Sequence, residues 1–144
     1  MVNKNSKNVT VVTVQYNPIF KDPSSNIKIL EELLLSYKKE DKIDLILFPE
    51  MTLTGYCFDS KEEIQDFLED YNDEESTTAV FARNIALQLE ANVLIGYPEK
   101  EDDKNYNSAM LVNRQGKKTD NFRKTHLYVT DKVKNLTYII GLGI

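Results

Sequence analysis

Two ionisable residues, Glu50 and Lys124, stand where they could carry out acid–base chemistry. Glu50 follows the apolar run LILFP, and a carboxylate at the rim of such a run is partly desolvated, which favours its neutral form and suits proton transfer. Lys124 lies in NFRKTHLY, just past an aromatic residue and just before an apolar pair. The alternative for each residue is structural: a surface or helix-capping glutamate, and an exposed lysine at a sheet edge.

The single cysteine and the single histidine limit the chemistry further. With only Cys57, the chain can form neither an internal disulfide nor a thiolate metal cluster. With only His126, a multi-histidine zinc site is impossible, and a Ser/His/Asp triad would need that residue. We expect Cys57 to be a packed or pocket-lining thiol, with a substitute nucleophile as the alternative. We expect His126 to pack or form hydrogen bonds near Lys124 rather than act as a base.

Strands and helices are predicted to alternate in the first half of the chain. Residues 9–16 (VTVVTVQY) are β-branched and nearly uncharged, which predicts a strand buried on both faces. Ser24 or Ser25 can cap the following helix, which we expect to carry lysines in its last turn. A second strand over 43–48 completes a crossover unit, so the two strands should be parallel and connected in the right-handed sense.

The same alternation continues as far as residue 98, and strands joined by a loop and a turn follow it. Ser60 and Glu63 form a capping box for a short acidic helix, and Ser76 or Thr77 begins a third helix. A strand over 92–98, the charged loop EKEDDK, and a strand over 105–113 follow. Gly116 then makes a tight turn into a return strand over 119–130. This order predicts an α/β fold in which Glu50 lies at the carboxyl end of a parallel strand, where sites of open α/β sheets collect.

Composition excludes several partners. The formal net charge of −5 offers no general attraction for nucleic acid. No apolar run approaches the ~18 residues of a membrane span, and the N-terminus lacks a secretion signal, so the cytoplasm is the expected compartment. A nucleotide-binding module is less favoured, because the first strand runs into QYNPIF instead of a glycine-rich loop.

Together these motifs resemble a known family. LILFPEMTLTGY, VLIGYPE and YNSAMLVNRQGKKTDNFRKTHLY are similar, in order and spacing, to the N-terminal half of the carbon–nitrogen hydrolase (nitrilase) superfamily, over residues 9–128. The resemblance implies one truncated domain over 1–144: half of an α-β-β-α sandwich, with a mixed sheet and helices packed on one face. It also implies amide or nitrile hydrolysis without metal or cofactor, in which Glu50 is the general base and Lys124 the catalytic lysine. LTGYCFDSKEEI is most similar to amidases that deamidate N-terminal Asn or Gln of proteins.

The chemistry needs those residue types. A carboxylate can take the proton of an attacking thiol, and a fixed ammonium can stabilise the oxyanion that attack creates. The family's cysteine and a further glutamate lie beyond its lysine, whereas this sequence has no Cys or Glu after Lys124. A non-catalytic binding or interaction module is therefore the alternative function. Half a sandwich also leaves an apolar face exposed, so we expect self-association or aggregation through it.

Overall fold

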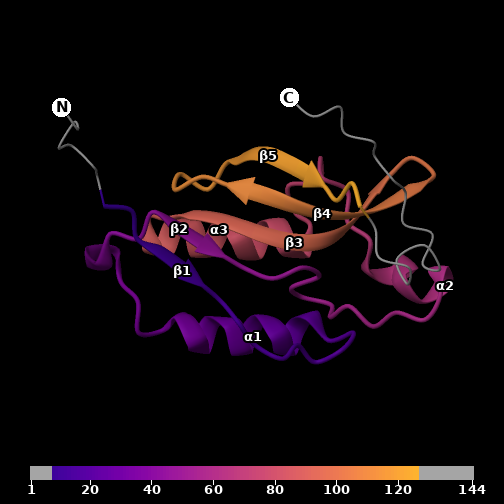
Figure 1. Ribbon diagram of the computed structural model, residues 1–144, viewed down its shortest axis with the longest axis horizontal. Helices are drawn as coiled ribbons and strands as arrows, with labels where there is room; N and C mark the ends of the chain where they lie inside the picture. Colours follow the sequence, from indigo (N-terminus) through magenta and orange to yellow (C-terminus); the bar gives the residue numbers. More distant parts are fainter. Residues whose placement is uncertain (1–7, 127–144) are drawn as a thin grey trace.

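The computed structural model describes residues 8–126, in which five strands pair in chain order into one mixed sheet (Figure 1). β1 and β2, and β2 and β3, pair in parallel, while β3, β4 and β5 are antiparallel. The predicted parallel pairing of the first two strands is confirmed. In chain order the elements are β1 (Val11–Thr13), α1 (Pro23–Leu34), the 3-10 turn η1 (Lys39–Asp41), β2 (Leu45–Leu47), α2 (Lys61–Ile64), the 3-10 turn η2 (Gln65–Phe67), α3 (Thr77–Leu89), β3 (Asn92–Glu101), β4 (Lys104–Val112) and β5 (Lys118–Arg123).

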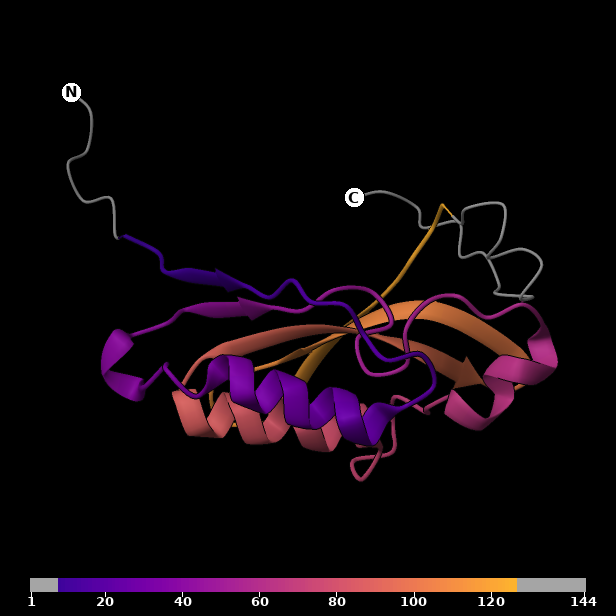
Figure 2. The same ribbon diagram turned by 90° about the horizontal axis from the view of Figure 1, so that it is seen from below.

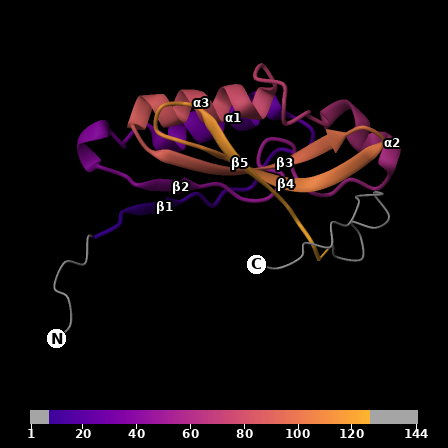
Figure 3. The same ribbon diagram turned by 90° about the horizontal axis from the view of Figure 1, so that it is seen from above.

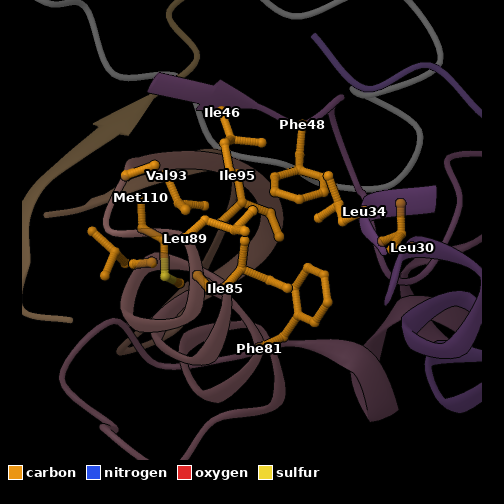
Figure 4. Packing of buried hydrophobic residues seen from close by; sticks show 14 of the residues in the cluster. Leu30, Leu34, Ile46, Phe48, Phe81, Ile85, Leu89, Val93, Ile95 and Met110 are labelled. Carbon is orange, nitrogen blue, oxygen red and sulfur yellow. The ribbon is translucent and has the colours of Figure 1, made fainter. Parts of the chain in front are cut away.

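Helices α1 and α3 cover one face of this sheet (Figures 2 and 3). Leu30 and Leu34 of α1 are buried there together with the inward residues of α3. These residues meet every second residue of the strands, because successive strand side chains point to opposite faces. Each fully buried Leu, Ile or Phe contributes about 1.5–3 kcal/mol through removal from water. The core residues labelled in Figure 4 are Leu30, Leu34, Ile46, Phe48, Phe81, Ile85, Leu89, Val93, Ile95 and Met110.

The opposite face of the sheet carries no helix of the described chain (Figure 2). Its apolar residues alternate with the core residues, and Val11 and Phe122 are 46% and 62% exposed. Leu45, Leu47 and Leu94 are half-buried on the same face. The α/β class, with a mixed sheet and helices on one face, is therefore confirmed, and an uncovered apolar face accompanies it.

The prediction of a long first strand buried on both faces is wrong. β1 has only three residues, and Val9 and Val11 are 68% and 46% exposed. The reason is that helices cover only one face of the sheet: Val12, Val14 and Tyr16 reach the core on that face, whereas Val11 lies on the other face, and β1 is also an edge strand. The β-branched pattern of residues 9–16 could not distinguish this edge from an interior strand.

Two helix ends also differ from prediction. Asp22, not Ser24 or Ser25, caps α1, because its carboxylate accepts a hydrogen bond from Ser25 N at 3.0 Å. The hydrogen bond from the Ser25 backbone amide is the main reason that the pKa of Asp22 is lowered. The helix ends at Leu34, before the lysines expected in its last turn.

The predicted capping box of α2 is half formed. Ser60 Oγ accepts from Glu63 N at 3.2 Å, while Glu63 Oε2 accepts from Asp59 N instead of the Ser60 amide. Glu63 also pairs with Lys21, and this interaction is the main reason that its pKa is lowered. The third helix begins at Thr77 as expected.

The β3–β4–β5 meander is more regular than predicted. The expected charged loop 99–104 is mostly strand, because the ladder runs on to the pair Glu101 and Lys104. Gly116, with φ +76°, makes the predicted turn between β4 and β5. β5 ends at Arg123, and residues 127–130 of the predicted return strand lie outside the described residues.

Candidate functional site

Glu50 lies just past the carboxyl end of β2, where the chain continues to follow β3. Phe48 N donates to Leu94 O at 2.9 Å, and Gly96 N donates to Pro49 O at 3.2 Å. The two backbones come so close that a Cβ on Gly96 would lie 2.6 Å from both Glu50 Cα and Pro49 O. Gly96 is therefore what allows Glu50 to sit directly against the sheet.

The loop after Glu50 turns sharply and is held by hydrogen bonds. Met51 has φ +46°, a left-handed conformation that is strained for a residue with a side chain. Thr52 N donates to Gly96 O at 3.0 Å, Thr52 Oγ1 donates to Pro49 O at 2.5 Å, and Tyr16 Oη donates to Thr52 O. Burial raises the pKa of Tyr16 to about 12, so this phenol remains a donor at neutral pH. These contacts fix the direction in which Glu50 leaves the strand.

Asn26 of α1 fixes the same loop from the other side. Its fully buried side chain accepts from Ile19 N at 2.8 Å and donates to Ile19 O and Leu53 O at 2.7 and 2.8 Å. Three backbone groups on two separate loops thus depend on one amide. Sequence reasoning missed Asn26, although a lone asparagine on the inward side of a helix is a recognisable signal.

Replacing Asn26 by leucine should lower the free energy of unfolding by about 3 kcal/mol, because buried backbone groups lose their partners. Urea denaturation measures this loss. Asn84, which is exposed on α3, is the control: its replacement by alanine should change stability by less than about 0.5 kcal/mol. Equal losses in the two variants would contradict the role given to the Asn26 amide.

Lys124 follows β5, the strand at the other edge of the sheet from β1, and reaches Glu50 on the same face. Its backbone N–H donates to Asn107 O at 2.8 Å, which continues the β4–β5 ladder by one residue. Its Nζ lies 3.3 Å from Glu50 Oε2 and 5.8 Å from the centroid of the Tyr56 ring. The structure thus brings together the two predicted residues, 74 positions apart in sequence.

Asn107 of β4 completes the cluster, and sequence reasoning missed it. Its side chain is buried, with 3% exposed, and Nδ2 donates to Glu50 Oε2 at 2.9 Å. Asn107 thus contacts the carboxylate through its side chain and Lys124 through its backbone. The run YNSAM places a polar residue inside a predicted strand, and this is the signal that could have identified Asn107.

These three side chains border a hollow of about 160 Å³ on the uncovered face of the sheet. A carboxylate, an ammonium and a carboxamide meet beside apolar side chains, a combination that can orient a small polar group and transfer a proton. The lining residues are Phe48, Pro49, Glu50, Leu94, Gly96, Asn107, Ser108, Ala109, Phe122 and Lys124.

Other sequence expectations at the site are not met. The Glu50 side chain is 54% exposed, so the described residues do not desolvate it to the expected extent. Cys57 is exposed and does not line the hollow, so the expectation of a packed or pocket-lining thiol is wrong. His126 agrees with expectation in one respect: it is exposed and does not pack, but its Nδ1 lies within hydrogen-bond distance, 3.0 Å, of Oγ1 of Thr125, the neighbour of Lys124. Cys57 lies in the irregular segment between the turn at residues 50–54 and α2.

A buried ion pair lies on the helix-covered face, behind Lys124. Arg123 Nε donates to Glu99 Oε2 at 2.9 Å and a terminal nitrogen donates to Glu99 Oε1, while Ser108 Oγ donates to Glu99 Oε2 at 2.5 Å. Arg123 also donates to Glu101 at 2.9 Å and lies over the Tyr106 ring at 4.0 Å. The hydrogen bonds to Glu99 and Glu101 raise the pKa of Arg123. Because neighbouring strand residues point to opposite faces, this pair fixes the strand end that carries Lys124.

A second hollow, of about 520 Å³, lies at the start of α3, and five of its twelve lining residues are acidic side chains that precede the helix. Burial raises the pKa of Glu69, whose carboxylate accepts from Thr78 N at 3.0 Å and from Thr78 Oγ1 at 2.8 Å.

Within residues 8–126, no group of three or more His, Cys, Asp or Glu side chains could hold a metal ion. The helices described there are all too short or too polar to cross a bilayer.

The chain is similar, in sequence and in fold, to members of one family of hydrolases. The carbon-nitrogen hydrolase family model matches residues 10–139. The chain is 37% identical over 125 residues to the protein N-terminal amidase of Saccharomyces cerevisiae, covering 84% of this chain and 27% of that protein. It is 32% identical over 124 residues to a nitrilase of Pyrococcus abyssi, covering 86% and 46%.

Solved structures show the same relationship. An N-terminal amidase crystallised with a Gln-Gly peptide matches with a TM-score of 0.82 and 33% identity, over 91% of this chain and 31% of that one. The chain thus spans less than half the length of each of these relatives.

Proposed function

Because this chain belongs to the carbon–nitrogen hydrolase family, as its motifs predicted, we propose that Glu50 and Lys124 form the base and the cation of an amide-hydrolysing site. The observation that carries the proposal is their meeting, with Lys124 Nζ 3.3 Å from Glu50 Oε2 at the edge of an apolar hollow. The relatives named N-terminal amidase, one of them crystallised with a Gln-Gly peptide, favour peptides with N-terminal Asn or Gln as substrates.

The proposed reaction uses Glu50 as the proton carrier in both half-reactions and Lys124 as the cation that faces the oxyanion. Glu50 takes the proton of a thiol as its sulfur attacks the side-chain amide carbon, and Lys124 stabilises the negative oxygen that results. The carbon–nitrogen bond breaks as Glu50 returns the proton to the departing ammonia. Glu50 then activates the water that hydrolyses the thioester.

Whether the chain supplies a nucleophilic thiol at the site decides between amide hydrolysis and binding without cleavage. Cys57 is the only cysteine of the sequence, and it is exposed and absent from the lining of the hollow. This observation favours a second candidate, a module that binds the amide without cleaving it. Cytoplasmic location, the absence of a nucleic-acid partner and self-association through the uncovered sheet face also stay predictions.

Peptide binding and ammonia release together test the proposal. We expect a Gln-Gly-initiated peptide to bind and to release ammonia when a small thiol such as 2-mercaptoethylamine is added, whereas a Gly-Gly-initiated peptide releases none. Glu50→Gln and Lys124→Met should each lower release about 100-fold or more, because the proton acceptor or the oxyanion partner is lost. Lys39→Met, at an exposed ion pair remote in sequence from the site, is the control.

The possible outcomes separate the two functions. Binding without release at any thiol concentration identifies the binding module. Release that needs no added thiol and disappears in Cys57→Ser identifies Cys57 as the nucleophile. Release that survives both site substitutions, or the absence of both binding and release, overturns the proposal.

A further inference from the structure

We propose that Asn107 is a positioning residue that selects which oxygen of Glu50 acts as the base. The inference rests on the proposed function. Asn107 Nδ2 and Lys124 Nζ both approach the same atom, Glu50 Oε2, at 2.9 and 3.3 Å. Oε1 accepts no hydrogen bond from the described part of the chain. The carboxylate is thus held through Oε2, and Oε1 is left to accept a proton.

The fold makes Asn107 better suited to this task than Lys124 alone. The lysine chain is long and flexible, and it binds as a point charge with three rotatable donors, so it fixes distance better than direction. Asn107 has a short side chain that is buried in a nine-residue strand, with neighbours on both sides. Its amide carries no charge, so it orients the carboxylate without neutralising it.

The backbone of Asn107 also sets the position of Lys124. Asn107 O accepts from Lys124 N at 2.8 Å. One residue therefore fixes the acid through its side chain and the cation through its main chain, and a side-chain substitution removes only the first of these links. This separation makes the role of the amide testable without displacing Lys124.

The chain offers a matched control on the same strand. Asn105 lies two residues before Asn107, on the same face of β4, and is 6% exposed. Its Nδ2 is buried without a hydrogen-bond partner among the described residues. Asn105→Leu therefore removes an equally buried amide that does not contact Glu50.

The first measurement examines the contact itself by NMR of the amide side chains. We expect the Asn107 side-chain proton that is donated to the carboxylate to move upfield in Glu50→Ala and to stay in place in Asn105→Leu. A resonance that does not respond to Glu50→Ala overturns the inference, whatever the activity of the chain.

The second measurement is the kinetics of ammonia release in the presence of added thiol. Asn107→Leu and Asn107→Asp should lower kcat about 10- to 100-fold with KM unchanged within about twofold, because a misdirected base affects the transition state more than binding. Asn105→Leu should leave both parameters within about twofold. An unchanged kcat in both Asn107 variants, or a change confined to KM, overturns the role of Asn107 and leaves the proposed function standing. A wild-type chain without Glu50-dependent release overturns both.

Discussion

Replacing Arg123 by methionine is expected to lower the free energy of unfolding by about 3–5 kcal/mol, because it leaves a buried carboxylate without its cation. The Glu99 side chain is fully buried, and the Arg123 side chain is only 17% exposed. Ser108 would remain as a neutral donor to Glu99, and one hydroxyl cannot replace a bidentate guanidinium. Urea denaturation at neutral pH measures the loss.

An exposed ion pair provides the control for this prediction. Lys39 and Glu90 lie 2.8 Å apart with 53% and 62% of their side chains exposed, so Lys39→Met should cost less than about 1 kcal/mol. The double variant Arg123→Met with Glu99→Leu should recover part of the stability, because it removes the buried charge as well. A single Arg123→Met variant as stable as Lys39→Met would show that Glu99 is not held as the structure describes.

The second large effect is expected from Gly96→Ala. The added methyl group would meet Glu50 Cα and Pro49 O at 2.6 Å, and both contacts are backbone, so the Glu50 segment must move away from β3. Overpacking of this kind costs about 1–3 kcal/mol. A shift of about 1 Å at the base also costs about 100-fold in rate, so ammonia release should fall by that factor or more.

Gly116→Ala separates the loss of the site from the loss of stability. Gly116 has φ +76° in the β4–β5 turn, and its Cβ would contact Arg83 and Leu87 side chains at 3.1 Å. This variant should therefore also be destabilised, by about 1 kcal/mol, while the hollow keeps its shape. Equal losses of peptide binding in the two variants would contradict the special role of Gly96.

The sequence predicted the interior of the sheet better than its edge. The apolar run of β3 and the apolar stripe of α3 both pack into the same core, so their hydrophobic patterns predicted a strand and a helix correctly. β1 was predicted too long and too buried because β-branched residues favour strands at an edge as much as inside. Asp22 caps α1, and Ser24 and Ser25 lie inside its first turn, because only the local backbone geometry decides which of several possible capping residues meets the free N–H groups.

At the site, the residue types were predictable, whereas the contacts between Glu50 and the residues that support it were not. Glu50 and Lys124 were identified because family motifs contain them, and their catalytic roles remain predictions. Asn107 and Gly96 matter only through strand register. The register places Asn107 opposite Pro98, and it brings Gly96 against the backbone of Pro49 and Glu50. No local pattern encodes a pairing between residues so far apart in sequence.

The 74-residue separation between the acid and the cation also couples ligand binding to folding. The pair does not exist in any locally folded fragment, because it requires the β2–β3 and the β4–β5 ladders at once. A ligand that bridges Glu50 and Lys124 therefore binds the native state alone and stabilises the whole sheet by mass action, by about 2.7 kcal/mol at a concentration 100 times its Kd. The melting temperature of the chain thereby becomes a direct reporter of site occupancy.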